Sequence, residues 1–190
     1  MVLAITGASG VIYGIRMARE LLLREFEVHL IASDAACIVL EQELDWDFSS
    51  GRAQTFYQQL PGSNLVYYDN DDIAAPVASG SFVSNGMMVM PCSMSTLSAI
   101  AHGSSNNLIT RAADVMLKER RPLILVPRET PLSTIHLRNM LLLSETGVHI
   151  VPAMPGFYSK PTSIDEIVDF MVGKVLDLTN IPNDLYHRYA

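Results

Sequence analysis

Residues 111–139 read RAADVMLKERRPLILVPRETPLSTIHLRN and join a short apolar strand to an unusual density of charge. The apolar run 123–126 predicts a buried strand, and Arg128 and Glu129 follow it directly after Pro127. Open α/β sheets bind their ligands at the carboxyl ends of parallel strands. The charge pair therefore indicates the ligand-binding edge of such a sheet.

The same stretch is basic although the whole chain is acidic. It holds six of the thirteen Lys and Arg residues against three acids, in a chain with a formal net charge of −7. The six are Arg111, Lys118, Arg120, Arg121, Arg128 and Arg138. A local excess of cations predicts a confined anion site, and phosphate is the anion we expect there. The overall acidity argues against a nucleic-acid surface, which needs many distributed cations.

Outside this stretch, short apolar runs alternate with segments of helical period, as in βαβ units. The runs predict strands at residues 2–6, 28–32, 65–68, 87–91, 123–126 and 148–151. Helices are expected in most gaps, including 11–24 and 35–44, and Ser163 opens a Ser-x-x-Glu capping pattern before the last helix. This order predicts an α/β fold: a three-layer Rossmann-like or flavodoxin-like domain with a mostly parallel sheet.

Length and composition predict one domain. The 190 residues, 49% of them hydrophobic, fit a single domain at 1–190, with residues 180–190 as a C-terminal tail. Long loops are expected at 49–63 and 69–85. Because no signal-like start and no apolar run of membrane length are visible, we expect a cytoplasmic protein without a membrane span. Cys37 and Cys92 are expected to be free, buried thiols.

Two strand-to-helix turns carry small hydroxylated residues that suit phosphate or a polar ring edge. Residues 7–10 read GASG after the first strand, and residues 93–96 read SMST after the fourth. Neither matches a dinucleotide or P-loop fingerprint. The alternative is structural, because Ser9, Ser93 or Ser95 can equally cap a helix.

Six segments together resemble the UbiX-type flavin prenyltransferases, which belong to a wider group of flavin-binding, Rossmann-like, homo-oligomeric proteins. An older label for this family is aromatic-acid or 3-octaprenyl-4-hydroxybenzoate decarboxylase. The segments are TGASGVIYGIR at 6–16, SDAA at 33–36, ASGS at 78–81, PCSMSTLS at 91–98, the stretch 111–139, and PGFYSKP at 155–161. The resemblance spans nearly the whole chain.

The resemblance implies a reaction and partners. A dimethylallyl group from dimethylallyl monophosphate would be joined to reduced FMN at N5 and then C6, without a metal. The prenylated FMN would serve a UbiD-type decarboxylase, in ubiquinone synthesis or the degradation of aromatic acids. The resemblance also implies a homododecamer.

Site residues follow from the same resemblance. Flavin contacts are implied for Gly7, Ala8, Ser9, Ser33, Ser93, Met94, Ser95, Thr96 and Arg128. Donor phosphate contacts are implied for Arg111, Lys118, Arg128, Tyr158 and Lys174, and catalytic roles for Glu43, Glu129 and Lys118. The residue pattern alone favours an exposed helix-end Glu43, a Lys118 that complements a helix dipole, and a packing role for Tyr158. Some members have Trp where this chain has Ile73 and Tyr189, which puts one or two walls of the prenyl pocket in doubt.

Three alternatives stay open at this stage. Flavin-dependent cysteine decarboxylases of the wider group carry Pro-Ala-Met-Asn after the fifth strand and a His shortly before the fourth; here the strand is followed by Arg128 and Glu129, and residues 70–90 contain no His. An aromatic-acid decarboxylase would need a carboxylate-polarising group that is not evident. A non-catalytic FMN-binding protein would leave Glu43, Lys118 and Tyr158 without a role.

Asp69-Asn70-Asp71-Asp72 is interpreted as a solvated turn and not as a metal motif.

Overall fold

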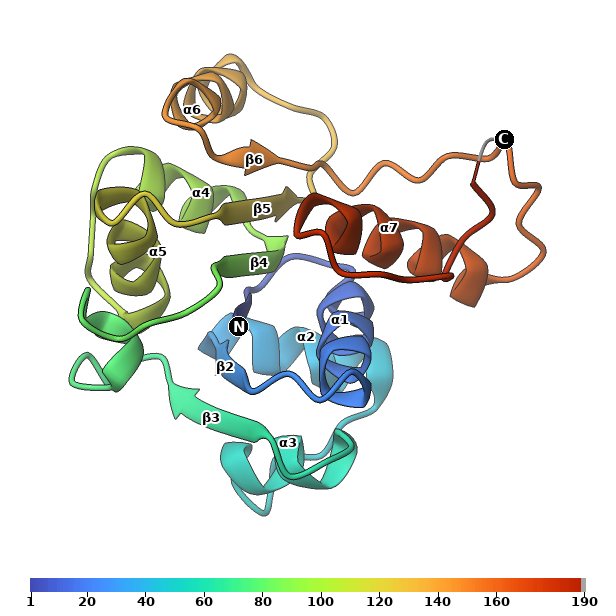
Figure 1. The fold of residues 1–190 in the computed structure, drawn as a ribbon, viewed down its shortest axis with the longest axis horizontal. Helices are drawn as coiled ribbons and strands as arrows, with labels where there is room; N and C mark the ends of the chain where they lie inside the picture. The colour runs from blue at the N-terminus through green and yellow to red at the C-terminus, as the bar shows by residue number, and fades with distance from the viewer. Residues whose placement is uncertain (189–190) are drawn as a thin grey trace.

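The computed structural model describes residues 1–188 and has a six-stranded sheet between two layers of helices (Figure 1). The strand order is β3-β2-β1-β4-β5-β6, and each of its pairings is parallel. The strands are β1 Val2–Ile5, β2 Val28–Ala32, β3 Leu65–Asp69, β4 Met87–Cys92, β5 Leu123–Pro127 and β6 His149–Ile150. The predicted α/β, Rossmann-like architecture is confirmed.

Strand alternation explains the layers. Leu3 and Ile5 of β1 enter one apolar cluster, whereas Val2 and Ala4 enter the other, because successive side chains point to opposite faces of a sheet. The first cluster is covered by α1 (Val11–Leu23), α2 (Asp34–Leu44) and α7 (Ile164–Leu178). The second is covered by α4 (Met94–Ala101), α5 (Leu108–Lys118) and α6 (Thr134–Glu145).

The strand order places a topological switch between β1 and β4. From β1 the chain proceeds outward through β2 to β3, and from β4 it proceeds the other way through β5 to β6. The loops that leave β1 and β4 therefore diverge at the carboxyl edge, which is where such sheets bind ligands. Both serine-containing turns lie at this point.

The expectation of a long loop at 49–63 was wrong, because it contains helix α3 (Arg52–Gln59). Phe56 is fully buried in this helix and packs on Trp46 and Tyr67 at ring centroid distances of 5.3 and 5.0 Å. The Thr55 hydroxyl donates to the Asp47 carbonyl at 2.9 Å. Aromatic packing thus outweighs the Ser- and Gly-rich start that suggested a loop. The other long loop, 69–85, contains only the short 3-10 helix η1 (Pro76–Ala78).

Residues 181–188 form no helix or strand, yet they pack closely on the domain. Ile181 and Asn183 are buried, and Arg24 of the first helical layer donates to the Pro182 carbonyl at 3.2 Å. The expected tail is therefore an anchored segment over its described part. Among residues 1–188, no helix is long and apolar enough to cross a membrane.

Candidate active site

Thr6 ties the two turns of the switch point together. Its hydroxyl donates to the Pro91 carbonyl at 2.8 Å and accepts from the Ser93 backbone N–H at 2.7 Å. Its own N–H also donates to the Pro91 carbonyl. The GASG turn after β1 and the SMST turn after β4 are consequently held in fixed register at the carboxyl edge.

Arg128 reaches across this edge from β5. Its Nε donates to the Ser9 carbonyl at 3.1 Å, and its backbone N–H donates to the Cys92 carbonyl at 3.4 Å. The guanidinium therefore lies beside the first turn, where the α1 N-terminus adds a partial positive charge. An anionic ligand beside the Ser9 turn would meet the Arg128 guanidinium, whereas the Gly10 and Val11 N–H groups of the α1 N-terminus already donate to Glu43.

Ser33 and Ser93 act as helix caps. The Ser33 hydroxyl accepts from the Ala36 N–H at 3.1 Å and begins α2, and the Ser93 hydroxyl accepts from the Thr96 N–H at 3.2 Å and begins α4. The structural interpretation thus holds for both residues. The N-termini of α1, α2 and α4 lie at the same carboxyl edge of the sheet. The flavin contacts implied for Ser33 and Ser93 stay a prediction. Gly7 supports close packing here, because an added Cβ would lie 2.3 Å from Ala35 Cβ.

Glu43 lies at the same edge although it comes from the far end of α2. Its carboxylate accepts from the Gly10 N–H at 2.9 Å and the Val11 N–H at 3.3 Å, so it caps the α1 N-terminus. The side chain is exposed, as is that of Glu41 on the same helix. The carboxylate is thus held beside the first turn, and its catalytic role stays a prediction.

Glu129 follows Arg128 and lines a cavity of about 60 Å³ between the ends of β5 and β6. Its Oε1 accepts from the Thr130 N–H at 3.0 Å. Met140 and Met154 line the same cavity. The charge pair Arg128 and Glu129 predicted from sequence thus lines a small cavity at the carboxyl edge of the sheet.

Arg111 and Lys118 lie elsewhere in the chain, on α5. Arg111 donates to the Ala78 carbonyl at 3.2 Å and pairs with Asp114 at 3.0 Å, while Lys118 Nζ pairs with Glu119 at 2.8 Å. Lys118 ends α5 just before β5 begins, whereas Arg128 follows the end of β5. Roughly 16 Å of strand, at about 3.3 Å per residue, therefore separates their levels in the sheet.

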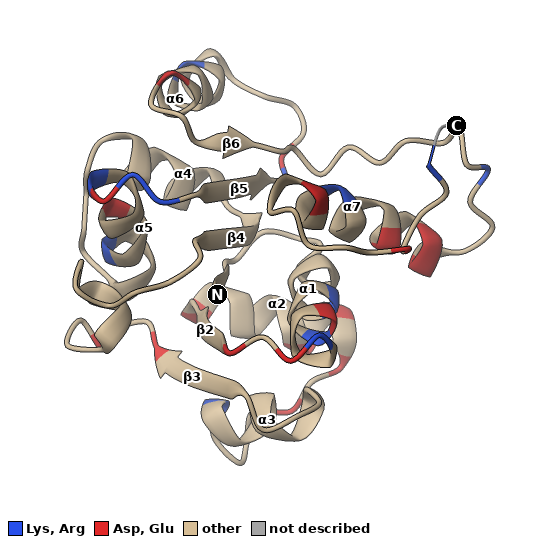
Figure 2. Ribbon diagram, in the orientation of Figure 1, with Lys and Arg blue, Asp and Glu red and all other residues tan. Residues whose placement is uncertain are grey.

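Tyr158 and Lys174 form a third group. Tyr158 packs edge-on against Phe170 of α7 at a centroid distance of 5.8 Å, and Lys174 Nζ lies 5.9 Å from the Tyr186 ring centroid. α5 and α7 cover opposite faces of the sheet, and both carry basic positions (Figure 2). Within one chain, Lys118 and Arg128 therefore lie at different levels of the sheet, and the predicted phosphate ligands come from separate segments.

Two features were missed by sequence reasoning. Arg121 donates to the carbonyls of Phe82 and Gly80 at 2.6 and 2.7 Å and so holds the ASGS loop against the end of α5. Residues 183–188 form a polar network on α7 that no local motif announced. For the Arg121 contacts, the basic run Arg120-Arg121 was the only signal in the sequence.

Other candidates have structural roles. Cys37 and Cys92 are buried free thiols, and burial raises the pKa of the Cys92 thiol, which disfavours a nucleophilic thiolate. Asp69 and Asp72 form a turn in which the Asp72 N–H donates to the Asp69 carbonyl at 3.1 Å. Within the described chain, no group of three or more His, Cys, Asp or Glu side chains is placed to hold a metal ion. Ile73 is exposed, and Tyr189 lies outside the described residues.

The Flavoprotein family model matches residues 1–176. The flavin prenyltransferase UbiX of Alkalihalophilus pseudofirmus is 50% identical over 193 residues, covering 100% of this chain and 96% of the relative. The chain belongs to the UbiX flavin prenyltransferase family. Another member, from Pseudomonas aeruginosa, is 48% identical and is matched over 99% of this chain and 92% of its own. The family assigned from six sequence segments is thus confirmed.

Solved structures of relatives agree. The crystal structure of AnUbiX (PadA1) with FMN and dimethylallyl pyrophosphate has a TM-score of 0.90 and 43% identity, with 100% of this chain and 96% of that chain covered. A dodecameric FMN-dependent UbiX-like decarboxylase from Escherichia coli O157:H7 has a TM-score of 0.87 and 40% identity, with both chains covered in full. The peptidyl-cysteine decarboxylase EpiD, at 18% identity and a TM-score of 0.61, shares the fold alone.

Proposed function

We propose that this protein is a flavin prenyltransferase that joins the dimethylallyl group of dimethylallyl monophosphate to reduced FMN at N5 and C6. The observation that carries the proposal is the convergence of Ser9, Ser93 and Arg128 at the switch point, in a chain 50% identical to a flavin prenyltransferase. The product, prenylated FMN, would be supplied to a UbiD-type decarboxylase. We place this activity in the cytoplasm.

The residues fit the chemistry of the bond that breaks. As the allylic carbon–oxygen bond cleaves, the departing phosphate takes the electron pair and gains negative charge, which nearby cations stabilise. Arg111, Lys118, Arg128, Tyr158 and Lys174 are the groups we assign to that phosphate. The new carbon–nitrogen bond requires loss of the N5 proton, and Glu43, Glu129 and the released phosphate are the candidate acceptors.

We infer that a complete site needs more than one subunit. Within one chain, the phosphate ligands fall on α5, directly after β5, in the loop before α7 and on α7, although phosphate contacts require them within hydrogen-bond reach. The related E. coli structure is a dodecamer. In addition, α6 exposes Ile135, Leu137 and Leu141 by 66, 52 and 60%, as a subunit-contact helix would. In a homododecamer in which α5 of one subunit packs against the β5 end of another, Lys118 and Arg128 of two different subunits would lie close together.

Flavin retention is expected to depend on Arg128. Arg128→Ala removes the only described guanidinium that bonds the Ser9 turn, and we expect FMN affinity to fall about 10- to 100-fold, since a charge-assisted contact contributes ~1.5–3 kcal/mol. Arg19→Ala, which removes an exposed arginine of α1 that donates to the Gln59 carbonyl, is the matched control. Fluorescence titration with FMN measures both. Full affinity in Arg128→Ala would show that the flavin site is wrongly placed.

Prenyl transfer is expected to need no divalent metal and to prefer the monophosphate donor. Protein cations would neutralise a singly phosphorylated leaving group, whereas diphosphate donors commonly require Mg²⁺ held by acidic motifs. The test is turnover of reduced FMN with dimethylallyl monophosphate in excess EDTA, beside the diphosphate with Mg²⁺. We expect undiminished turnover in the chelator. Loss of activity there, restored by Mg²⁺, would contradict the proposal.

A further inference from the structure

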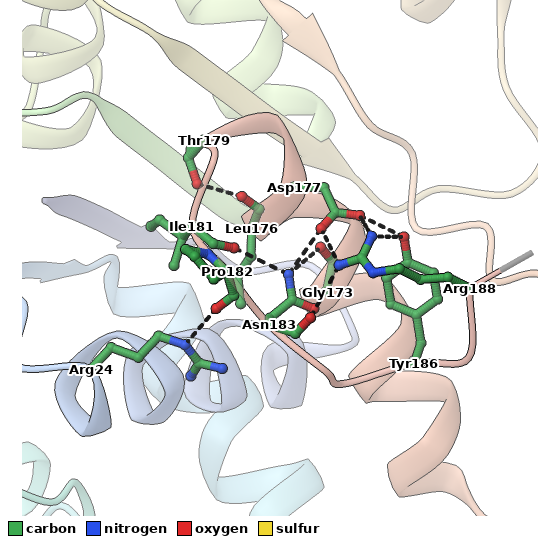
Figure 3. A network of polar contacts seen from close by, with 10 residues as sticks. All are labelled: Arg24, Gly173, Leu176, Asp177, Thr179, Ile181, Pro182, Asn183, Tyr186 and Arg188. Carbon is green, nitrogen blue, oxygen red and sulfur yellow. Dashed lines mark hydrogen bonds and ion pairs between the residues drawn. The ribbon is translucent and has the colours of Figure 1, made fainter. Parts of the chain in front are cut away.

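The segment 181–188 is fastened to α7 through Asp177 (Figure 3). Both oxygens of the Asp177 carboxylate accept from Arg188, at 2.8 and 2.9 Å. The Asn183 amide donates to the same carboxylate at 2.9 Å, and the Tyr186 hydroxyl donates to it at 2.5 Å. One carboxylate thus gathers three side chains of the segment, and the bidentate arginine contact fixes their geometry.

This network keeps its charge states across the neutral pH range. The hydrogen bond from Arg188 is the main cause that holds the pKa of Asp177 well below its usual value. Burial, followed by the contact with Asp177, raises the pKa of Tyr186 to about 12. Near neutral pH the carboxylate is therefore ionised and the phenol is protonated, which is the pairing that the contacts require.

Gly173 lets the segment lie flat on the helix. A Cβ added at this position would lie 2.5 Å from the Tyr186 ring and 2.9 Å from Asn183 Oδ1, closer than real side chains approach. The Asn183 amide also donates to the Gly173 carbonyl at 3.4 Å. The Tyr186 ring consequently rests directly on α7, next to Lys174.

An aromatic row then leads from the segment to the predicted donor-phosphate residues. The Tyr186 ring packs edge-on against Phe170 at 5.2 Å and 70°, and Phe170 packs edge-on against Tyr158 at 5.8 Å and 79°. Lys174 Nζ lies 5.9 Å from the Tyr186 ring centroid, within cation–π range. The Tyr186 ring therefore packs on Phe170, which supports Tyr158, and lies within cation–π range of the Lys174 ammonium group.

We propose that the segment 181–188 is a positioning element for the prenyl donor, with Tyr186 as its working residue. Lys174 and Tyr158 are both exposed, and a free lysine side chain samples many rotamers. The anchored Tyr186 ring restricts Lys174 directly and Tyr158 through Phe170, so that both are preset to receive the phosphate. This inference rests on the proposed function, which assigns those two residues to the donor.

The test compares Tyr186→Ala with Tyr186→Phe in the full-length oligomer. Tyr186→Ala removes the ring, and we expect the KM for dimethylallyl monophosphate to rise about tenfold while FMN affinity stays within twofold of wild type. Tyr186→Phe keeps the ring and should return the KM to near the wild-type value. His187→Ala, at an exposed position of the same segment, is the matched control and should leave the KM unchanged. KM, kcat and FMN affinity are measured for each variant.

An unchanged KM in Tyr186→Ala would overturn the inference, and so would an equal loss of donor and FMN affinity, because a merely structural role affects both. If Tyr186→Ala does not fold, Asp177→Ala decides by the same readouts, since it removes the carboxylate that gathers Asn183, Tyr186 and Arg188 but keeps the Tyr186 ring. Lys174→Ala separates the two levels of the account. If the KM for dimethylallyl monophosphate rises in Lys174→Ala but not in Tyr186→Ala, only the positioning role of Tyr186 is rejected. An unchanged KM in Lys174→Ala rejects the donor assignment itself.

Discussion

Lys118→Ala is expected to slow prenyl transfer by about 10²- to 10³-fold, the usual effect of removing one preorganised charge from a transition state. FMN affinity should remain unchanged, because Lys118 is assigned to the donor phosphate and not to the flavin. Single-turnover formation of prenylated FMN measures the rate. Arg120→Ala is the control, since Arg120 is an exposed cation just beyond the same helix.

Mixed oligomers extend this prediction to the shared site. Coexpressed Lys118→Ala and Arg128→Ala subunits should regain activity that neither variant has alone, because each supplies the cation that the other lacks. With random assembly of two-subunit sites, about a quarter would contain both cations. Mixtures without any regained activity would contradict a site composed of α5 from one subunit and the β5 end of another.

Glu43→Gln is expected to keep FMN bound and to slow product formation by about 10²-fold or more, within the range for loss of a general base. Glutamine retains an acceptor oxygen for the Gly10 and Val11 N–H groups, so the α1 N-terminus stays capped. It cannot accept a proton at neutral pH. The measurement is single-turnover product formation under reducing conditions.

Glu41→Gln supplies the comparison, since Glu41 is an exposed acid on the same helix and has no contact with the α1 N-terminus. It should behave as wild type. Equal rates for Glu43→Gln and wild type would return Glu43 to a purely capping role. A loss of FMN from Glu43→Gln would instead show that the carboxylate organises the flavin turn.

The fold was predictable because its strands are buried apolar runs. β5 is buried along its whole length and lies between β4 and β6, so its sequence is apolar without alternation. Helix α3 was missed because its stability comes from Phe56 packing on distant aromatic rings, which a local pattern does not contain. β6 is shorter than expected, with pairing confined to His149 and Ile150.

The site was predictable only where it is local. The turns at 7–10 and 93–96 follow directly from residues next to strand ends, and the structure places both at the switch point. The bond between Glu43 and Gly10 joins residues 33 positions apart and depends on how α2 packs beside α1. The distance between the level of Lys118, at the end of α5, and that of Arg128, after β5, is likewise a tertiary property that spacing along the chain does not reveal.

The mass of the flavin recovered after anaerobic incubation with reduced FMN and dimethylallyl monophosphate tests the central claim most directly. The account predicts FMN heavier by one five-carbon unit, with an equal amount of phosphate released and a changed absorbance spectrum. Recovery of unmodified FMN after incubation with a large molar excess of the donor over the protein, with no phosphate released, would contradict it.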